Sequence, residues 1–390
     1  MTEISGHYDD RFVGVVEAMQ ANFENHGEVG ASVAVVHEGE MVVDIWGGYT
    51  SEEKTEAWQE DTIVNVWSTT KTMMAISALV LADRGELDMF RPVAEYWPEF
   101  AVNGKERIEV RHLMSHTSGV SGWAEPLTME EVCDWEKSTA ILAAQEPWWE
   151  TGTASGYHML NQGHLVGEVV RRVTGQSLGT FFAQEIATPL DADFHIGLSE
   201  NEFHRISNVM YPSGDSSDQL ELFREAVEVH KINPEVAMKT FMNPAPDANS
   251  AWTDWWRKAE VPAANGHGNA RSVAKIQALI SNGGEMGGKK LLSDETIDLI
   301  FQEQSNGIDL VLLTPLRFGI GYGLPVDDLP FLRKDGRVCF WGGWGGSLII
   351  NDVDNNLTIS YMMNRMLTSV MGDERGAAIV EATYKALEES

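Results

Sequence analysis

The pattern Ser-x-x-Lys occurs three times in the sequence, as Ser51/Lys54, Ser68/Lys71 and Ser272/Lys275. A lysine placed three residues after a serine can accept the hydroxyl proton and so turn the serine into a nucleophile. The motif is short enough to arise by chance, so the surrounding sequence has to separate the three copies.

Two of the copies have a simple structural interpretation. Ser51 lies in the polar run SEEKTEAWQED, which is typical of a solvated turn. Ser272 follows a loop rich in glycine and asparagine, where we expect it to cap the N-terminus of a helix. Ser68 differs because the short strand IVNVW at 63–67 delivers it to the start of a helix that is apolar through MMAISALVL.

The spacing of Ser68 and Lys71 puts both side chains on one face of that helix. Burial there would lower the Lys71 pKa toward the range in which the amine takes a proton from serine. The positive end of the helix dipole would also favour the developing alkoxide. The alternative is a serine cap beside a lysine whose amine reaches solvent.

Tyr157 follows a run of small residues, TGTASG, and precedes the helical stretch NQGHLVGEVVRRV. A tyrosine beside a cationic lysine can hold a lowered pKa and act as general base on the serine. A lone tyrosine is also a common core residue. We assign the adjacent His158 to the substrate-binding surroundings, in a supporting role and not a catalytic one.

Glycines interrupt a strand pattern at Trp341-Gly342-Gly343-Trp344. Such glycines mark either a bulge or a place where another group approaches the backbone closely. Close approach suits an oxyanion hole, in which one backbone donor is worth about a hundred- to a thousand-fold in rate. A bulged edge strand with packed tryptophans is the alternative.

The elements that would position these residues follow from periodicity. Helices are predicted at 10–25, from Ser68 to about Gly85, and at 161–173, 272–280, 294–302 and 375–389. Strands are predicted at 30–48, with a turn at Glu38-Gly39, and at 338–343, 347–353 and 357–364. Strands at both ends and a helical middle predict an α+β fold, an α/β sandwich in which helices flank one antiparallel sheet. We expect a discontinuous sheet domain, 1–84 and 265–390, and a mainly helical domain, 85–264, with the active site in the cleft between them. An exposed loop is predicted at 214–218.

Composition limits the possible partners. The 390 residues include 28 basic and 59 acidic side chains, a formal charge of −31, which argues against binding to nucleic acid or to an anionic membrane. Two cysteines cannot build a disulfide framework. The chain shows no basic segment before an apolar run at its start and no run of membrane-spanning length, so we expect a cytoplasmic protein, monomeric or homodimeric.

Taken together, Ser68-Thr69-Thr70-Lys71, Tyr157 and Trp341-Gly342-Gly343 resemble the serine beta-lactamase and penicillin-binding-protein superfamily, and more narrowly the family VIII carboxylesterases with a class C beta-lactamase-like fold. The likeness extends to HLMSHTSG at 112–119 and NGHGNARS at 265–272. It implies that Ser68 is the nucleophile, Lys71 its activator and Tyr157 the general base. The oxyanion hole would be the backbone N–H groups of Ser68 and Trp344.

The resemblance also implies no cofactor and no metal, since it makes the segment around His112 and His116 a structural loop. The sequence departs from the beta-lactamases of this fold at two places: Trp341-Gly342-Gly343 replaces Lys-Thr-Gly, and Tyr157-His158-Met159 replaces Tyr-x-Asn. Losing that lysine and asparagine favours a neutral ester over an anionic lactam. Some esterases of the family carry a second tyrosine where this chain has Trp123, which is expected to shape the acyl pocket.

We therefore expect a serine carboxylesterase that acts on short-chain or aromatic esters through an acyl-enzyme, with a small-molecule ester as its partner. Two other functions remain open at this point. One is a beta-lactamase or D-amino-acid peptidase of the same superfamily. The other is a catalytically silent penicillin-binding-like recognition protein, which would have no need of Ser68, Lys71 and Tyr157 together.

Overall fold

The structure is a computed structural model that describes residues 2–211 and 227–389. The loop predicted at 214–218 lies outside the described residues. No helix within the described ranges has the length and apolar character needed to cross a membrane.

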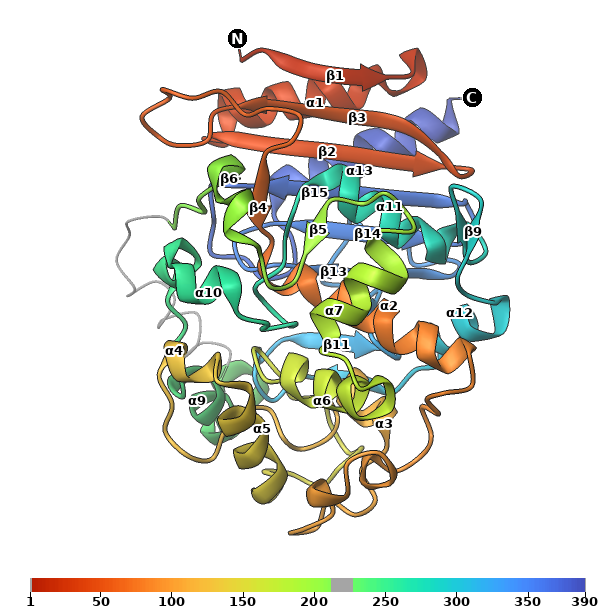
Figure 1. Ribbon diagram of the computed structural model, residues 1–390. Helices are drawn as coiled ribbons and strands as arrows, with labels where there is room; N and C mark the ends of the chain where they lie inside the picture. Colours follow the sequence, from red (N-terminus) through yellow and green to blue (C-terminus); the bar gives the residue numbers. More distant parts are fainter. Residues whose placement is uncertain (1, 212–226, 390) are drawn as a thin grey trace.

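A nine-stranded antiparallel sheet forms the centre of the molecule (Figure 1). In spatial order its strands are β1 (Ile4–Tyr8), β3 (Glu40–Gly48), β2 (Gly30–His37), β15 (Leu357–Met363), β14 (Leu348–Asp352), β13 (Val338–Gly342), β12 (Gly323–Leu324), β11 (Pro315–Phe318) and β10 (Ser305–Ile308). β2 pairs with β15, with Val33 opposite Tyr361, so strands from the two ends of the chain meet inside the sheet. This arrangement confirms the predicted sheet.

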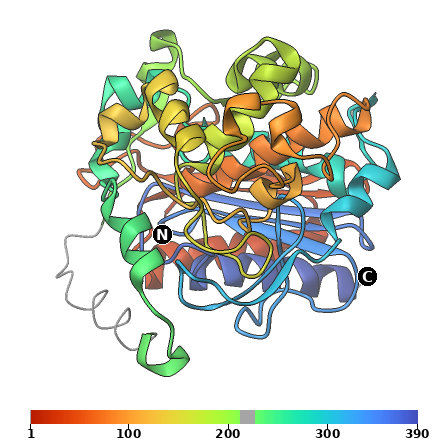
Figure 2. The same ribbon diagram turned by 90° about the horizontal axis from the view of Figure 1, so that it is seen from below.

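Two layers of helices enclose the sheet, which Figure 2 shows from its edge. One layer holds α1 (Val13–Asn25) and α13 (Glu374–Glu388), which pack against each other. The other holds α2 (Thr70–Asp83) and α11 (Ala270–Ser281), and α11 lies on β2, β14 and β15. The core fills the space between these layers and the sheet.

α2 is buried from Thr70 to Leu81. It contacts α11 and three further helices, namely α6 (Gln162–Thr174), α7 (Leu178–Phe182) and α12 (Asp294–Ile300). A helix enclosed on all sides has no solvated face, which explains why its sequence is apolar all round. The one lysine in it, Lys71, is therefore held away from water.

The region between α2 and α11 is mostly helical. Within the described residues this region also includes α3 (Val110–Met114), α4 (Met129–Val132), α5 (Trp135–Ala144), α9 (Glu235–Met242) and α10 (Asp254–Lys258). It also contributes β5 (Phe194–His195) and β6 (Ile206–Ser207), which join β4 (Ile63–Asn65) and β7 (His267–Gly268) in a small second sheet. A two-stranded hairpin of β8 (Glu285–Met286) and β9 (Lys289–Lys290) follows α11.

Local sequence signals explain several boundaries. Glu38 and Gly39 both have positive φ, 52° and 79°, as the predicted tight turn between β2 and β3 requires. The prediction that Ser272 caps a helix was wrong by three residues. Asn269 is the N-cap of α11, and Ser272 occupies the third helical position, where its hydroxyl accepts from the Asn269 backbone N–H in a reciprocal capping box.

Candidate active site

Ser68 lies in a 3₁₀ turn, Trp67–Thr69, between β4 and α2. Trp67 has φ +47°, in the left-handed region that a bulky residue rarely adopts. Such a conformation persists where the surrounding structure enforces it, and strained residues of this kind cluster at functional sites. The turn places Ser68 at the start of α2 with 9% of its surface exposed.

Lys71 is buried, and its side-chain nitrogen Nζ faces three oxygens. Ser68 Oγ lies 3.1 Å away, the Met159 carbonyl oxygen 2.7 Å and the Ala263 carbonyl oxygen 2.9 Å. Because carbonyl oxygens only accept hydrogen bonds, two N–H groups of Lys71 point at Met159 and Ala263. Burial holds the Lys71 pKa well below its usual value, since the charged form loses hydration. In the neutral amine, the remaining position on Nζ is a lone pair that faces Ser68 Oγ.

Tyr157 lies against Lys71 and Trp341. The Lys71 nitrogen is 4.8 Å from the centre of the tyrosine ring, and the Trp341 indole N–H donates to the Tyr157 hydroxyl oxygen over 3.3 Å. Burial raises the Tyr157 pKa, and smaller effects of the Ser68 hydroxyl and Trp341 oppose the rise. The lowered tyrosine pKa expected from the sequence is therefore wrong, because burial disfavours the phenolate more than its neighbours favour it. Tyr157 is a neutral phenol.

Asp309 holds the loop that presents Tyr157. Its carboxylate oxygen Oδ1 accepts hydrogen bonds from the backbone N–H groups of Tyr157, at 3.0 Å, and of Val311 and Leu312, both at 2.9 Å. Asp309 is fully buried, and burial raises its pKa above the usual aspartate value. Sequence reasoning missed this residue because it lies 152 positions from Tyr157 and belongs to no recognisable motif.

His158 supports the same loop from within the protein. It is fully buried, with Nδ1 2.6 Å from the Gly156 carbonyl oxygen and Nε2 2.6 Å from Ser118 Oγ. The carbonyl can only accept, so Nδ1 carries the proton and Ser118 donates to Nε2. Burial lowers the His158 pKa to about 3, which keeps the ring neutral. These contacts agree with the supporting, non-catalytic role expected for His158, whereas no contact supports its assignment to substrate binding, because both ring nitrogens are used inside the protein.

His112 and His116 each have a partner of their own. His112 Nδ1 accepts from the Glu109 backbone N–H at 3.0 Å, and His116 Nδ1 accepts from the His158 backbone N–H at 3.0 Å. The His116 ring packs on the Tyr157 ring, with centroids 4.8 Å apart. In the described part of the chain, no three His, Cys, Asp or Glu side chains gather as a metal site.

Gly343 brings the end of β13 against the nucleophile turn. A methyl group on Gly343 would lie 2.3 Å from the Val66 carbonyl oxygen and 3.3 Å from the Ser68 nitrogen, so this approach requires glycine. Ser347 ties the two segments together: its hydroxyl donates to the Val66 carbonyl at 2.9 Å and lies 2.9 Å from Thr69 Oγ1. The backbone after Gly343 therefore runs beside Ser68, as an oxyanion hole with two donors requires.

Trp344 follows directly and is half-buried. Its backbone N–H has no hydrogen-bond partner among residues 2–211 and 227–389. Its indole ring packs on Trp67 and Tyr211, with centroid distances of 5.1 and 5.0 Å. Glycine at position 342 is explained by close packing, since a methyl group there would lie 2.9 Å from Met371 Cα.

Arg375 fixes the far side of the Gly343–Ser347 turn. Its guanidinium is fully buried, donates to the Gly345 carbonyl at 2.9 Å and pairs with Glu28 at 3.2 Å and Asp373 at 2.7 Å. A charged group held this way orients the loop through bonds to both of its carboxylate partners. Sequence reasoning missed Arg375, whose position in the final helix shows no motif.

Trp123 lies away from these groups. It is 2% exposed, its indole N–H donates to the Ser138 carbonyl at 3.2 Å, and its ring packs edge-on against His164 at 5.4 Å. Within the described residues, no hydrogen bond or ring contact joins Trp123 to Ser68, Lys71 or Tyr157. The Trp123 side chain packs in the core of the helical region, and its expected role in the acyl pocket stays a prediction.

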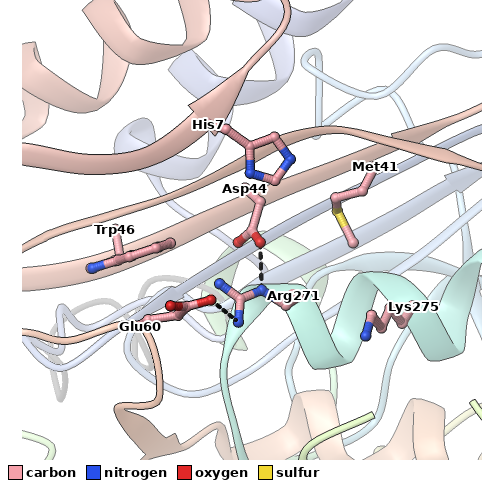
Figure 3. A pocket seen from close by; sticks show the side chains of 7 residues that line it. All are labelled: His7, Met41, Asp44, Trp46, Glu60, Arg271 and Lys275. Carbon is pink, nitrogen blue, oxygen red and sulfur yellow. Dashed lines mark hydrogen bonds and ion pairs between the residues drawn. The ribbon is translucent and has the colours of Figure 1, made fainter. Parts of the chain in front are cut away.

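A separate pocket of about 340 Å³ lies between β1, β3 and the start of α11 (Figure 3). Its lining residues are His7, Met41, Asp44, Trp46, Glu60, Arg271 and Lys275. The Arg271 guanidinium already pairs with Asp44 and Glu60, and Lys275 Nζ donates to the Asp191 carbonyl at 2.9 Å. Because the basic side chains Arg271 and Lys275 of this pocket are already paired, the candidate active site remains the group of residues around Ser68.

Comparisons with known proteins find matches that extend along nearly the whole chain. A beta-lactamase family model matches residues 15–384. The chain is 32% identical over 378 residues to the esterase/beta-lactamase LipL of Mycobacterium tuberculosis (strain ATCC 25618 / H37Rv), covering 96% of this chain and 86% of LipL.

Solved structures show the same likeness. The crystal structure of a family VIII carboxylesterase superposes with a TM-score of 0.90 at 38% identity, covering 98% of this chain and 100% of that chain. A penicillin-binding protein homologue from Caulobacter crescentus gives a TM-score of 0.88 at 32% identity, covering 99% of this chain and 100% of that chain. The fold and the family resemblance expected from the sequence are confirmed.

Proposed function

Because the chain belongs to the beta-lactamase family and is a serine hydrolase, we propose that it cleaves uncharged esters of short-chain or aromatic carboxylic acids through an acyl-enzyme on Ser68. The observation that carries this proposal is the placement of Lys71 Nζ, which has two N–H groups held by carbonyls and its third position at Ser68 Oγ. The likeness to a carboxylesterase and to an esterase/beta-lactamase supports an ester substrate.

Lys71 is the base in the acylation step. Its neutral amine takes the proton of Ser68, and Ser68 Oγ forms a bond to the ester carbonyl carbon. The carbonyl oxygen becomes an oxyanion, which the backbone N–H groups of Ser68 and Trp344 hold in place. This role replaces the one that sequence reasoning gave to Tyr157, because burial disfavours both the ammonium and the phenolate.

Tyr157 serves the leaving group. Its phenol protonates the departing alkoxide oxygen as the carbon–oxygen bond breaks, and the Lys71 ammonium restores the phenolic proton. Trp341 holds the phenol in place through its hydrogen bond to the hydroxyl oxygen. In deacylation a water molecule takes the place of the alcohol. It loses a proton to Lys71 as its oxygen bonds to the acyl carbon; the bond from that carbon to Ser68 Oγ then breaks, and Oγ takes the proton back from Lys71 as the acid is released.

An uncharged substrate fits the electrostatics of the site. Among the described residues, Lys71 is the only basic side chain bonded to Ser68, and its N–H groups are already used. Trp341 stands where lysine would bind the carboxylate of an anionic lactam in the resembling beta-lactamases. With a formal charge of −31 on the chain, an anionic substrate would be further disfavoured.

The direct test compares Ser68→Ala with Ser51→Ala, which changes the serine of another Ser-x-x-Lys copy. We expect Ser68→Ala to lose turnover of p-nitrophenyl butyrate and labelling by a fluorophosphonate, seen as a mass shift, while Ser51→Ala keeps both. Full activity in Ser68→Ala would refute the proposal. Nitrocefin turnover equal to ester turnover would favour a beta-lactamase, and absence of labelling in the native protein would favour a silent recognition protein.

A further inference from the structure

A small apolar cluster surrounds Tyr157, separate from the main core. Its half-buried members are Met159, Val236, Phe241, Leu312 and Met371, which pack around the buried Tyr157 ring and its apolar neighbours. A half-buried apolar side chain leaves part of its surface to water, and burying that surface is favourable. Five such side chains around one proposed catalytic group form a surface that an apolar ligand would cover.

Three of these residues have backbone atoms in contact with the proposed reacting groups or with the residues that hold them in place. The Met159 carbonyl accepts from Lys71 at 2.7 Å. The Leu312 backbone N–H shares the Asp309 carboxylate oxygen that also holds Tyr157. Met371 lies against Gly342, at the start of the proposed oxyanion turn. The apolar surface therefore keeps a fixed position relative to the chemistry.

Val236 and Phe241 come from α9, which is anchored to the protein by polar contacts. Thr240 Oγ1 lies 2.7 Å from Ser121 Oγ, and Asn243 Nδ2 donates to the Trp123 carbonyl at 2.7 Å. The neighbouring Met242 points away and is 70% exposed. α9 thus presents Phe241 to the cluster around Tyr157 and Met242 to solvent.

The chemistry fixes which half of an ester meets this surface. The carbonyl oxygen must face the backbone N–H groups of Ser68 and Trp344, and the leaving oxygen must face the proton donor, Tyr157. The group attached to the leaving oxygen then extends over the side chains around Tyr157. The acyl group extends from the opposite side of the carbonyl carbon, away from this cluster. The half-buried rings of Trp344 and Tyr211 pack on each other and on the main core, not on the cluster around Tyr157.

We propose, on the basis of the ester hydrolysis inferred above, that Val236, Phe241, Leu312 and Met371 form a subsite for the alcohol portion of the ester. The enzyme then prefers esters of bulky apolar alcohols, such as aryl alcohols, over those of small ones. Acyl preference is set elsewhere and is independent of α9.

The test varies one half of the ester at a time. Phenyl and 1-naphthyl acetate share the acyl group, and p-nitrophenyl acetate and butyrate share the leaving group. For Phe241→Ala we expect the naphthyl-to-phenyl ratio of kcat/KM to fall by about tenfold or more, the scale of lost packing in an apolar pocket. The butyrate-to-acetate ratio and the deacylation rate of the common acetyl-enzyme, from pre-steady-state bursts, should stay as in the native protein. Met242→Ala is the matched control on the same helix.

Each outcome decides the proposal. A fall in the butyrate-to-acetate ratio, or no change in either ratio, overturns it. If Phe241→Ala does not fold, as judged by circular dichroism, two other variants replace it: Phe241→Leu and Leu312→Ala. For both we expect the same fall in the naphthyl-to-phenyl ratio of kcat/KM. A native protein that hydrolyses no ester would instead refute the proposed function.

Discussion

Lys71 Nζ lies 3.1 Å from Ser68 Oγ and has its two other hydrogen-bonding positions occupied by main-chain carbonyls. An ammonium would donate to Ser68 from this position, whereas a neutral amine would accept its proton. Burial favours the neutral amine. The same geometry therefore supports the proposal that Lys71 acts as the base once its proton is lost.

Lys71→Arg should lower kcat/KM for p-nitrophenyl butyrate by about a hundred- to ten-thousand-fold, the range of general-base catalysis. The variant keeps the positive charge and a long side chain, but a guanidinium cannot lose its proton at accessible pH. Lys275→Arg, in the third Ser-x-x-Lys copy, is the control and should retain activity. Activity retained in Lys71→Arg would show that charge, and not proton transfer, is what Lys71 supplies.

The pH dependence of kcat/KM should carry the signature of Lys71. Protonation at low pH removes the lone pair, so activity should fall as the pH decreases through the Lys71 pKa. Because burial holds that pKa well below the usual 10.5, we expect substantial activity at neutral pH. The measurement is initial rates on an uncharged ester across the stable pH range. Activity that rises only near pH 10.5 would contradict the neutral amine.

Tyr157→Phe should lower the rate most for esters with poor leaving groups. A phenol that protonates the leaving oxygen matters more for ethyl butyrate than for p-nitrophenyl butyrate, whose leaving group departs without help. For the ethyl ester we expect a loss of about a hundred- to ten-thousand-fold in kcat/KM. Equal losses for both esters would return Tyr157 to the role of general base on Ser68.

Gly343→Ala should lower kcat by about a hundred- to a thousand-fold, because the new methyl group displaces the oxyanion turn from Ser68. It would lie 2.3 Å from the Val66 carbonyl oxygen and cannot be accommodated without movement of the backbone. Gly307→Ala is the control, since a methyl group there meets no atom within 4 Å. Thermal unfolding of both variants separates a misplaced turn from a general loss of folding. Near-native kcat in a folded Gly343→Ala would argue against this oxyanion hole.

The stability of the protein should decrease with acidification partly through His164. This side chain stacks on Trp135 at 5.0 Å, and burial lowers its pKa to about 4. Between about pH 6.5, the usual histidine pKa, and pH 4, the unfolded chain binds a proton at this position that the folded protein does not bind. The free energy of unfolding therefore decreases as the pH is lowered through this range. One such group contributes at most about 1.4 kcal/mol per pH unit.

Urea unfolding at several pH values between 4 and 7 measures this effect. His164→Gln can keep the hydrogen bond to the Val132 carbonyl but does not titrate, so its unfolding free energy should depend less steeply on pH. An unchanged slope in His164→Gln would show that His164 is not neutral in the folded state.

Candidate catalytic residues that a motif or a helical spacing marks in the sequence could be predicted. The spacing of Ser68 and Lys71 places both on one helix face. The glycines before Trp344 indicated that another group approaches the backbone closely there. Asp309 and Arg375 were not predictable, because each acts through contacts with residues far away in the sequence. The contacts of His158 and Trp123 were not predictable for a related reason: their side chains point into the protein, and a sequence pattern does not show which way a loop residue turns.

The family resemblance, the sheet built from both chain ends and the pairing of Ser68 with Lys71 could be inferred from the sequence alone, because strand alternation, helical spacing and ordered motifs are local properties of the chain. The protonation of the site and its surroundings depend instead on how distant segments pack together. Enclosure of α2 dehydrates Lys71, burial favours the phenol form of Tyr157, and packing of α9 adds Phe241 to the apolar cluster that contains Tyr157. Desolvation and long-range packing arise from the whole fold, so no single stretch of sequence encodes them.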